Sequence, residues 1–316
     1  MVISEPILSL AEYRVAERLM GNHFEITVVA HGEDWAKEKI AMAIIEIRRI
    51  EKLLTTFDAT SQTNQVNSQA GIAPVEVGQE FFDLVKRSVR ISEITGGAFD
   101  ISYGSIDKRL WNFDCHMTSL PDESTARQMV SLINYRNIML FEEDRSIMLK
   151  EKGMRIGFGG IGKGYAAEMA KALLIRQGVK NGIVNAAGDL TAWGKQANGK
   201  PWTVGIANPD QASLPFASME ISGMAIATSG NYEKYVTISG KKYSHTINPK
   251  TGLPVTGIKS VTIISPNAEI ADALATPVTI MGVKAGLQLV NQLKHIACII
   301  IDDNNKIYTS KNINLQ

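Results

Sequence analysis

The feature that most constrains the fold of this chain is a glycine-rich loop. A short segment with the pattern of a β-strand precedes the loop, and a segment with apolar residues at helical spacing follows it. The loop region reads Arg155-Ile156-Gly157-Phe158-Gly159-Gly160-Ile161-Gly162-Lys163-Gly164-Tyr165. Glycines allow a ligand to approach the backbone closely, and the first N–H groups of the helix lie at its positive end. Such a helix start attracts phosphate groups. Lys163 adds a full positive charge at the same place.

Two familiar phosphate-binding patterns match this loop only in part. The dinucleotide fingerprint G-x-G-x-x-G fits from Gly157 to Gly162, but it requires a βαβ unit and an acidic residue about 20 positions later. The next acidic residue near a predicted strand end is Asp189. The P-loop pattern fits from Gly157 to Lys163, but Gly164 stands where a hydroxyl should hold Mg²⁺. Three interpretations stay open: a tight helix start without a ligand, one of these two folds, or another phosphate-binding fold whose metal ligands lie elsewhere.

A carboxylate and a hydroxyl on a later predicted helix are candidates for such metal ligands. In the segment Ala268-Glu269-Ile270-Ala271-Asp272-Ala273-Leu274-Ala275-Thr276, Asp272 and Thr276 are separated by one helical turn and share a face. Both offer the hard oxygen atoms that Mg²⁺ prefers, and Mg²⁺ usually keeps positions for phosphate oxygens and water. The alternative is an aspartate that only complements the helix dipole.

A histidine at the end of a predicted strand is the third candidate. The segment Tyr243-Ser244-His245-Thr246-Ile247-Asn248-Pro249-Lys250-Thr251-Gly252 ends in a proline turn. A histidine beside hydroxyl groups can act as a general base, so His245 is a candidate for that role. The alternative is a structural histidine held by hydrogen bonds.

The hydrophobic pattern predicts an α+β fold, with strands in hairpins and helices between them. Helices are expected over 34–54 with Asp34 as N-cap, 79–94, 121–131, 161–178 ending at Gly178, 268–280 with a kink at Pro277, and 283–293. Strands are expected over 23–30, 137–141, 146–150, 154–158, 181–186, 189–194, 202–207, 224–228, 234–238, 241–247 and 258–264, with a closing hairpin around 302–305. Residues 55–71 are polar and predict a loop, and no clear linker is present.

Composition excludes some classes of protein. The formal net charge is +1 and no basic run is present, which argues against a nucleic-acid partner. Cys115 and Cys298 lack the spacing of a disulfide framework or a zinc site and are expected to be unpaired. No apolar run approaches the length of a transmembrane segment, and the first residues do not form a signal peptide. The expected compartment is cytoplasmic by default, or periplasmic as an exported protein or lipoprotein if a leader has been removed.

Taken together, these segments resemble the ApbE family of FAD:protein FMN transferases. The resemblance runs from Met20-Gly21 to about Gly282 and rests on several motifs in the family's order. They are Gly97-Ala98-Phe99-Asp100, Leu110-Trp111-Asn112-Phe113, Gly159-Gly160-Ile161-Gly162-Lys163-Gly164-Tyr165-Ala166, Asn185-Ala186-Ala187-Gly188-Asp189, Thr228-Ser229-Gly230-Asn231-Tyr232, Ser244 to Gly252, and Ala271-Asp272-Ala273-Leu274-Ala275-Thr276.

The resemblance implies both an architecture and an activity. It implies antiparallel sheets with packed helices, a single catalytic unit over 1–316 with possible sub-lobes 1–118 and 119–316, and an FAD site in a cleft between the two parts. It implies an enzyme that uses Mg²⁺, takes FAD as substrate, attaches FMN through a phosphoester to Thr or Ser of a target flavoprotein, and releases AMP. The alternatives are an FAD pyrophosphatase that gives FMN and AMP, and a flavin-binding module.

The resemblance also assigns residues. Asp272, the Thr276 hydroxyl and the Gly160 carbonyl would hold Mg²⁺, Lys163 would face the pyrophosphate, and His245 would act as base. The pocket for FAD would be lined by Met20, Phe57, Ala98, Phe99, Asp100 and Thr246. The chain departs from the family pattern at Phe57, which is often Tyr, at Gly157, often Asp, at Ala187, usually Gly, and at Asn248, commonly Asp.

Overall fold

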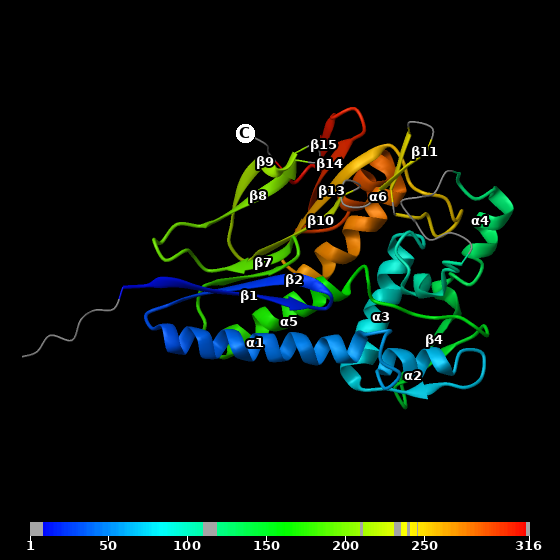
Figure 1. Cartoon of the computed structure of the whole chain (residues 1–316), viewed down its shortest axis with the longest axis horizontal. Helices are drawn as coiled ribbons and strands as arrows, with labels where there is room; N and C mark the ends of the chain where they lie inside the picture. The colour runs from blue at the N-terminus through cyan, green and yellow to red at the C-terminus, as the bar shows by residue number, and fades with distance from the viewer. Residues whose placement is uncertain are drawn as a thin grey trace, which may run out of the picture.

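A computed structural model describes residues 9–109, 119–208, 211–230, 235–238, 241–244 and 246–313 (Figure 1). Its centre is an antiparallel eight-stranded sheet in the order β1-β2-β6-β7-β10-β13-β14-β15. The mixture of antiparallel sheets and helices confirms the α+β prediction. Several residues singled out in the sequence lie outside the described part of the chain, namely Leu110 to Phe113, Cys115, Asn231, Tyr232 and His245.

The strands of the central sheet come from both halves of the chain. They are β1 (Ala11–Leu19), β2 (Asn22–Ala30), β6 (Gly182–Ala186), β7 (Asp189–Trp193), β10 (Met224–Gly230), β13 (Ile258–Ser265), β14 (Ala297–Asp302) and β15 (Ile307–Thr309). Three smaller sheets are formed by β3 (Val75–Glu76), β5 (Ser146–Leu149) and β4 (Ile138–Phe141), by β8 (Trp202–Asn208) and β9 (Gln211–Ile221), and by β11 (Tyr235–Ile238) and β12 (Lys241–Ser244). The strands β1 and β9 were not expected from the sequence.

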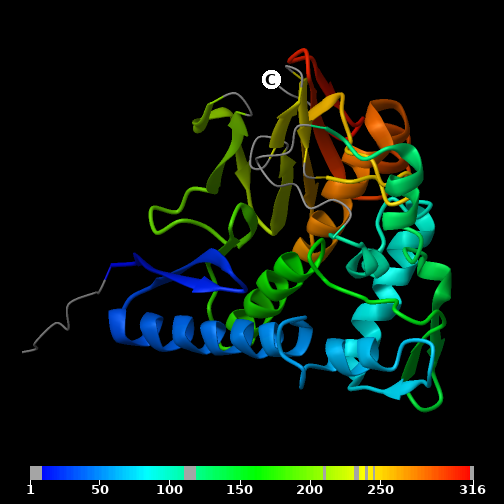
Figure 2. The ribbon, with the colours of Figure 1, turned by 45° about the vertical axis from the view of Figure 1, so that its right-hand side comes forward.

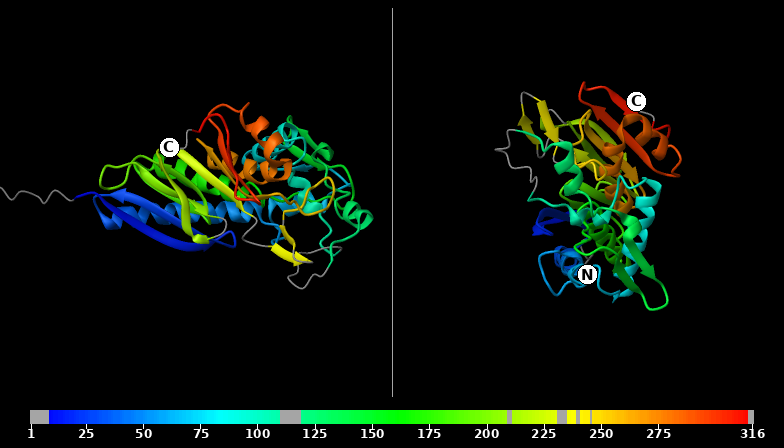
Figure 3. Two further views of the ribbon diagram at one scale, coloured as in Figure 1. Left: turned by 90° about the horizontal axis from the view of Figure 1, so that it is seen from above. Right: turned by 90° about the vertical axis from the view of Figure 1, so that its right-hand side faces the viewer.

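Helices cover one face of the central sheet and extend beyond its edge (Figure 2). They are α1 (Glu33–Leu54), α2 (Gln62–Ser68), α3 (Gln79–Ile94), α4 (Glu123–Met129), α5 (Gly162–Arg176) and α6 (Ala268–Val290), with short 3-10 turns η1 (Ile101–Ser105) and η2 (Tyr135–Asn137). The helix α5 packs between α1 and α6, and α6 lies against β10 and β13. Seen from above, α1 and β1 extend to one end of the molecule and α4 lies at the other (Figure 3).

Periodicity explains why α1 forms where it was expected. Its buried residues recur every three or four positions, which makes one continuous apolar face. They are Ala36, Ile40, Ala43, Ile44, Ile47, Ile50 and Leu54. The N-cap prediction was wrong, because Gly32 occupies that position and Asp34 lies in the first turn. There its charge still complements the helix dipole.

Helix α6 contains the two helices expected over 268–280 and 283–293, and they are separated at Gly282, between those ranges, rather than kinked at Pro277. The backbone is non-helical at Gly282, with a φ of 81°, while Pro277 lies inside the helical part. Glycine reaches positive φ without a steric penalty, whereas proline is fixed near −65°. By length and composition α6 is the one helix in the described residues that could span a membrane. It packs on α5 and on the sheet, and it carries the buried acidic residues Glu269 and Asp272, as a core helix does.

Side-chain hydrogen bonds account for two further differences from the prediction. The polar stretch 55–71 contains α2, whose first turn is capped by Ser61: its Oγ accepts from the Asn64 N–H at 3.1 Å. The expected strand 154–158 is extended but not part of a sheet. The Asn67 side-chain amide takes the place of a neighbouring strand there, because it accepts from the Ile156 N–H at 2.7 Å and donates to the Ile156 carbonyl at 3.0 Å.

Candidate active site

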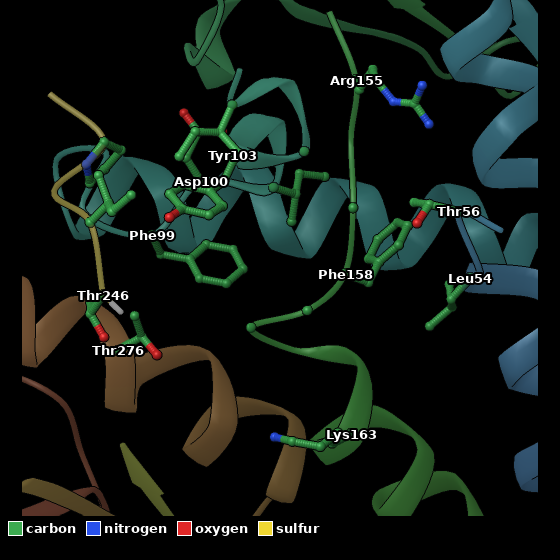
Figure 4. Close-up of a pocket in the computed structure, with 18 of the residues that line it drawn as sticks. Leu54, Thr56, Phe99, Asp100, Tyr103, Arg155, Phe158, Lys163, Thr246 and Thr276 are labelled. Atoms are coloured by element: carbon green, nitrogen blue, oxygen red, sulfur yellow. The ribbon is translucent and has the colours of Figure 1, made fainter. Parts of the chain in front are cut away.

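A cavity of about 1060 Å³ opens where the glycine loop meets the N-terminal half of the chain. Its walls come from the β1–β2 turn, the end of α1, the loop before η1, the glycine loop, the segment after β12, and α6. Figure 4 shows Phe99 between these walls, with Leu54 and Thr56 to one side and Thr246 next to Thr276 on the other. The cavity therefore draws on segments that are far apart in sequence.

Nearly all the residues assigned from the resemblance meet at this cavity. Its lining includes Met20, Phe57, Ala98, Phe99, Asp100, Gly160, Lys163, Thr246 and Thr276. Asp272 is buried one helical turn before Thr276, next to Lys163. His245 lies outside the described residues, while its sequence neighbour Thr246 is buried and lines the cavity.

Lys163 lies at the end of the cavity next to α6 (Figure 4), and its ammonium group pairs with two buried carboxylates. Its ammonium group forms an ion pair with Asp189, and its Nζ is 3.6 Å from Asp272 Oδ1. The second oxygen of Asp272, Oδ2, accepts from the Gly164 N–H at 2.9 Å. Two buried carboxylates thus flank one ammonium group whose side chain is 26% exposed, and a buried carboxylate is stabilised by a cation placed next to it.

The protonation of this group follows from burial and charge. Burial raises the pKa of Asp189, and the nearby Asp272 charge raises it further, while the Lys163 ammonium opposes both. Burial alone would lower the pKa of Lys163, but Asp272 and Asp189 together raise it above its ordinary value. Lys163 is therefore positively charged at neutral pH.

The sequence interpretation missed the role of Asp189. In the sequence, Asp189 was only the next acidic residue near a predicted strand end, too far from the glycine loop for the dinucleotide fingerprint, and the last residue of a motif. In the fold, β7 begins at Asp189 directly after the β6–β7 turn, and the strand brings the carboxylate to Lys163, which is 26 positions earlier in the chain. Asp189 is visible in the sequence as part of the motif from Asn185 to Asp189. Its contact with Lys163 appears only when the fold brings the β6–β7 turn next to the start of α5.

The donor set near Lys163 fits Mg²⁺ by its chemistry. Asp272 supplies a carboxylate, Thr276 a hydroxyl and Gly160 a carbonyl, and all three are hard oxygen donors. Thr276 and Gly160 line the cavity, and Asp272 lies beside it. Where the chain is described, no group of three His, Cys, Asp or Glu residues gathers as a metal site. A site with a single carboxylate would not form such a group.

Phenylalanine side chains also line the cavity. Phe99 is buried, and its N–H donates to Thr95 Oγ1 at 3.1 Å, so the backbone of its loop is held in place. Phe57 is 99% exposed although it lines the cavity. An exposed aromatic ring at a cavity edge suits a planar ring system that stacks on it.

Asp100 lines the cavity but uses its carboxylate to hold the loop. Oδ1 accepts from the Ser102 N–H at 2.8 Å and from the Ser102 hydroxyl at 2.6 Å, and Oδ2 accepts from the Tyr135 N–H at 2.7 Å. Burial raises the pKa of Asp100, and these hydrogen bonds oppose that change. The carboxylate thus shapes the wall beside Phe99.

Comparison with known proteins identifies similar chains over almost the whole length. The sequence profile of the ApbE family matches residues 20–300. The chain is 30% identical over 300 residues to an FAD:protein FMN transferase of Klebsiella pneumoniae (strain 342), with 94% of this chain and 92% of that protein aligned. It is 29% identical over 262 residues to an FAD:protein FMN transferase of Escherichia coli (strain K12), with 81% and 74% aligned.

Solved structures share the fold. The ApbE protein of Thermotoga maritima superposes with a TM-score of 0.85 at 27% identity, covering 95% of this chain and 97% of that one. The flavinyl transferase ApbE of Pseudomonas stutzeri superposes with a TM-score of 0.84 at 23% identity, covering 97% of each chain.

Proposed function

The chain belongs to the ApbE family, and from this membership we propose that it is a Mg²⁺-dependent FAD:protein FMN transferase. The enzyme takes FAD as substrate, attaches FMN through a phosphoester to a Thr or Ser hydroxyl of a target flavoprotein, and releases AMP. The observation that supports this proposal best is the arrangement at one cavity of aromatic side chains, a lysine at a helix start and a set of oxygen donors that includes the buried Asp272.

The size and chemistry of the cavity suit a flavin dinucleotide. About 1060 Å³ is at the upper end of small-molecule sites, as an extended dinucleotide requires. Phe57 and Phe99 offer surfaces for a planar ring, and the start of α5 with Lys163 offers charge to a pyrophosphate. Met20, Ala98, Asp100 and Thr246 complete the proposed pocket.

Lys163 has the clearest proposed role in the chemistry. The acceptor hydroxyl oxygen bonds to the phosphorus of the FMN half, and the P–O bond to the AMP half breaks, so negative charge gathers on the leaving AMP phosphate. A fixed ammonium group offsets that charge without reorganising in the transition state. Asp189 holds this ammonium in place, and the charges of Asp272 and Asp189 together raise its pKa and keep it protonated. Lys163 therefore binds the pyrophosphate and stabilises its cleavage.

Asp272, Thr276 and the Gly160 carbonyl are the proposed ligands of Mg²⁺. When bound, Mg²⁺ offsets charge on the pyrophosphate as a Lewis acid. Asp189 forms the closer ion pair with Lys163, and Asp272, whose Oδ1 is 3.6 Å from Nζ, is the carboxylate that we assign to the metal. The proton of the acceptor hydroxyl passes to a base, for which His245 stays the proposed residue.

The test is a transfer assay with a purified acceptor domain that carries a flavinylation-type Ser/Thr motif. We expect flavin fluorescence on the acceptor in a denaturing gel, dependent on Mg²⁺. Asp272→Asn keeps an acceptor oxygen for the Gly164 N–H, so we expect it to fold and to lose about 100-fold or more of the rate, as the loss of a metal's several kcal/mol requires. AMP release without labelling would instead indicate a pyrophosphatase, and FAD binding without AMP a binding module.

Two variants test the residue assignments separately. If His245→Ala transfers FMN at the wild-type rate across pH, His245 is not the base. If Asp272→Asn keeps its Mg²⁺ dependence and rate, the metal ligands lie elsewhere.

A further inference from the structure

A cluster of charged and aromatic side chains joins α1, α3, α5 and α6 outside the proposed active site. We name it the Arg87 cluster, and it consists of Arg49, Glu80, Arg87, Tyr165 and Glu269. Arg87 Nε and Nη2 donate to the two carboxylate oxygens of Glu269 at 2.7 and 3.0 Å. The Tyr165 hydroxyl donates to Glu80 at 2.6 Å, and Arg49 donates to both oxygens of Glu80 at 2.7 Å.

Three of these helices each deliver one part of the proposed active site. Helix α3, which carries Arg87, ends just before the loop of Phe99. Helix α5, which carries Tyr165, begins beside Lys163. Helix α6 carries Glu269 one turn before Asp272. A change in how these helices meet would therefore change the distances between Phe99, Lys163 and Asp272.

The first turn of α6 is held by polar contacts from two other helices. The Ala268 N–H donates to Glu168 Oε2 at 2.8 Å, and Arg87 donates two hydrogen bonds to Glu269. Asp272 itself accepts from Gly164 on α5. The contact from Arg87 comes from α3, the helix that leads into the loop of Phe99. It therefore fixes the position of α6 relative to that loop, whereas the contacts from Glu168 and Gly164 fix it relative to α5.

The energetics of this pair favour a role in orientation over one in stability. The Glu269 side chain is 5% exposed and the Arg87 side chain 43%. Only the carboxylate of this pair is buried, and the cost of desolvating it offsets much of the attraction to the partly solvated guanidinium, so the pair is expected to add little net stability. A two-pronged guanidinium–carboxylate contact does, however, fix direction as well as distance. The Arg87 guanidinium also lies 5.8 Å from the centre of the Tyr165 ring, which restricts it further.

We propose that Arg87 and Glu269 are positioning residues that orient Asp272 and Thr276 on α6 for the cation of the active site. They touch neither substrate nor cation and act through the rotation of the first turns of α6. The inference rests on the proposed function, because it assigns these two residues to the metal site named there.

The experiment compares Arg87→Met with Arg90→Met, a matched loss of an arginine one turn later on the same helix. Arg90 pairs only with the exposed Glu93 among the contacts recorded for its described side chain, so this variant removes an ion pair without touching α6. Mn²⁺ replaces Mg²⁺ as the probe, and its binding to the FAD-free protein is titrated by electron paramagnetic resonance. The kcat and KM of transfer and the midpoint of thermal unfolding are measured on the same samples.

We expect Arg87→Met to raise the Kd for Mn²⁺ about tenfold or more, the usual range for residues that orient metal ligands. We expect kcat to fall by a similar factor, with the KM for the acceptor unchanged. Arg87→Lys keeps the positive charge but cannot form the two-pronged contact with Glu269. Its affinity for Mn²⁺ should therefore lie between that of Arg87→Met and that of the wild type. Arg90→Met should match the wild type in every measurement.

A Kd for Mn²⁺ in Arg87→Met within twofold of that in Arg90→Met would overturn the proposal. If Arg87→Met does not fold, Glu269→Gln takes its place, because it keeps the volume and only weakens the pair; an unchanged Kd there would also overturn it. Failure of the proposed function would look different. The wild type would then leave the acceptor unlabelled. The comparison of Mn²⁺ affinities would still show whether Arg87 positions the metal ligands.

Discussion

Phe57 is fully exposed at the cavity edge, and at the residue scale this predicts a variant that separates binding from stability. A ring that buries no surface contributes little to folding. Stacking of an aromatic side chain on a planar base contributes about 1–3 kcal/mol. We therefore expect Phe57→Ala to raise the Kd for FAD by roughly 5- to 150-fold, with an unchanged unfolding midpoint. Phe57→Tyr should bind FAD as the wild type does. Equal affinity in Phe57→Ala, measured by flavin fluorescence quenching, would remove Phe57 from the pocket.

A substitution at Ala187 is expected to change the stability of the fold without changing the affinity for FAD. Ala187 has a φ of 54° in the β6–β7 turn, a region that costs a non-glycine residue about 1–2 kcal/mol. Glycine removes this strain but loses about 0.5–1 kcal/mol in chain entropy. Ala187→Gly should therefore raise the free energy of unfolding by up to about 1.5 kcal/mol, as measured by urea denaturation.

The control for Ala187→Gly is Ala16→Gly, at an exposed position of strand β1. Ala16 is not among the residues with positive φ, so only the entropic loss applies and the variant should be less stable. If both changes destabilise the protein equally, strain at Ala187 is not significant.

Single residues were predictable where chemistry is local. Lys163 and Thr276 stand out because a helix start and an i, i+4 pair are visible in the sequence, and the fold brings both to one cavity. Asp189 and Glu269 were not predicted as site residues. Their partners, Lys163 and Arg87, are distant in sequence, so only the packing of helices and strands shows what these carboxylates contact.

At the scale of the element, Gly164 sets how closely α5 and α6 approach. A Cβ atom there would lie 2.2 Å from the Ala268 carbonyl oxygen and 2.6 Å from Asp272 Cβ. Gly164→Ala must push α6 away, and overpacking of this kind costs about 1–3 kcal/mol. We expect lower stability together with weaker Mn²⁺ binding, because Asp272 moves with α6.

Gly162 provides the matched control on the same helix. A Cβ atom at Gly162 would meet its nearest neighbours at 3.5 Å, an ordinary contact. Gly162→Ala should therefore keep both the unfolding midpoint and the Mn²⁺ affinity close to wild type. Similar losses in the two variants would show that the effect of Gly164→Ala does not come from the α5–α6 contact.

Elements with a strong apolar period were predictable from the sequence, and those held by side-chain hydrogen bonds were not. Helices α1 and α3 follow from their buried stripes. The extended segment at 154–158 reads as a strand by composition, but the Asn67 amide satisfies its backbone. The break in α6 at Gly282 falls between the helices expected over 268–280 and 283–293, whereas the kink expected at Pro277 is absent from the described helix.

At the scale of the whole molecule, Glu80 links stability to pH. Hydrogen bonds from Arg49, and then from Tyr165, lower the pKa of Glu80 below its ordinary value of 4.5, against the effect of burial. The unfolded chain therefore binds a proton more readily than the native one in this window. The contribution of Glu80 to stability is complete above pH 4.5 and is lost as the pH falls through its lowered pKa.

Glu80→Gln checks this linkage. The difference in unfolding free energy between the wild type and this variant should be largest at pH 7 and should shrink below pH 4.5. Glu93→Gln removes an exposed pair, which contributes little, and should show no such trend. A difference that is constant with pH would show that Glu80 is not held as its contacts indicate.

The most direct test of the central claim is to measure AMP and acceptor-bound FMN in one reaction with FAD, Mg²⁺ and an acceptor domain. Intact mass spectrometry of the acceptor reports the gain of one FMN, and chromatography reports AMP. A transferase predicts that the two products appear in equal amounts and that both disappear when the acceptor hydroxyl is replaced. AMP formed at an unchanged rate on an acceptor without its hydroxyl would contradict the account.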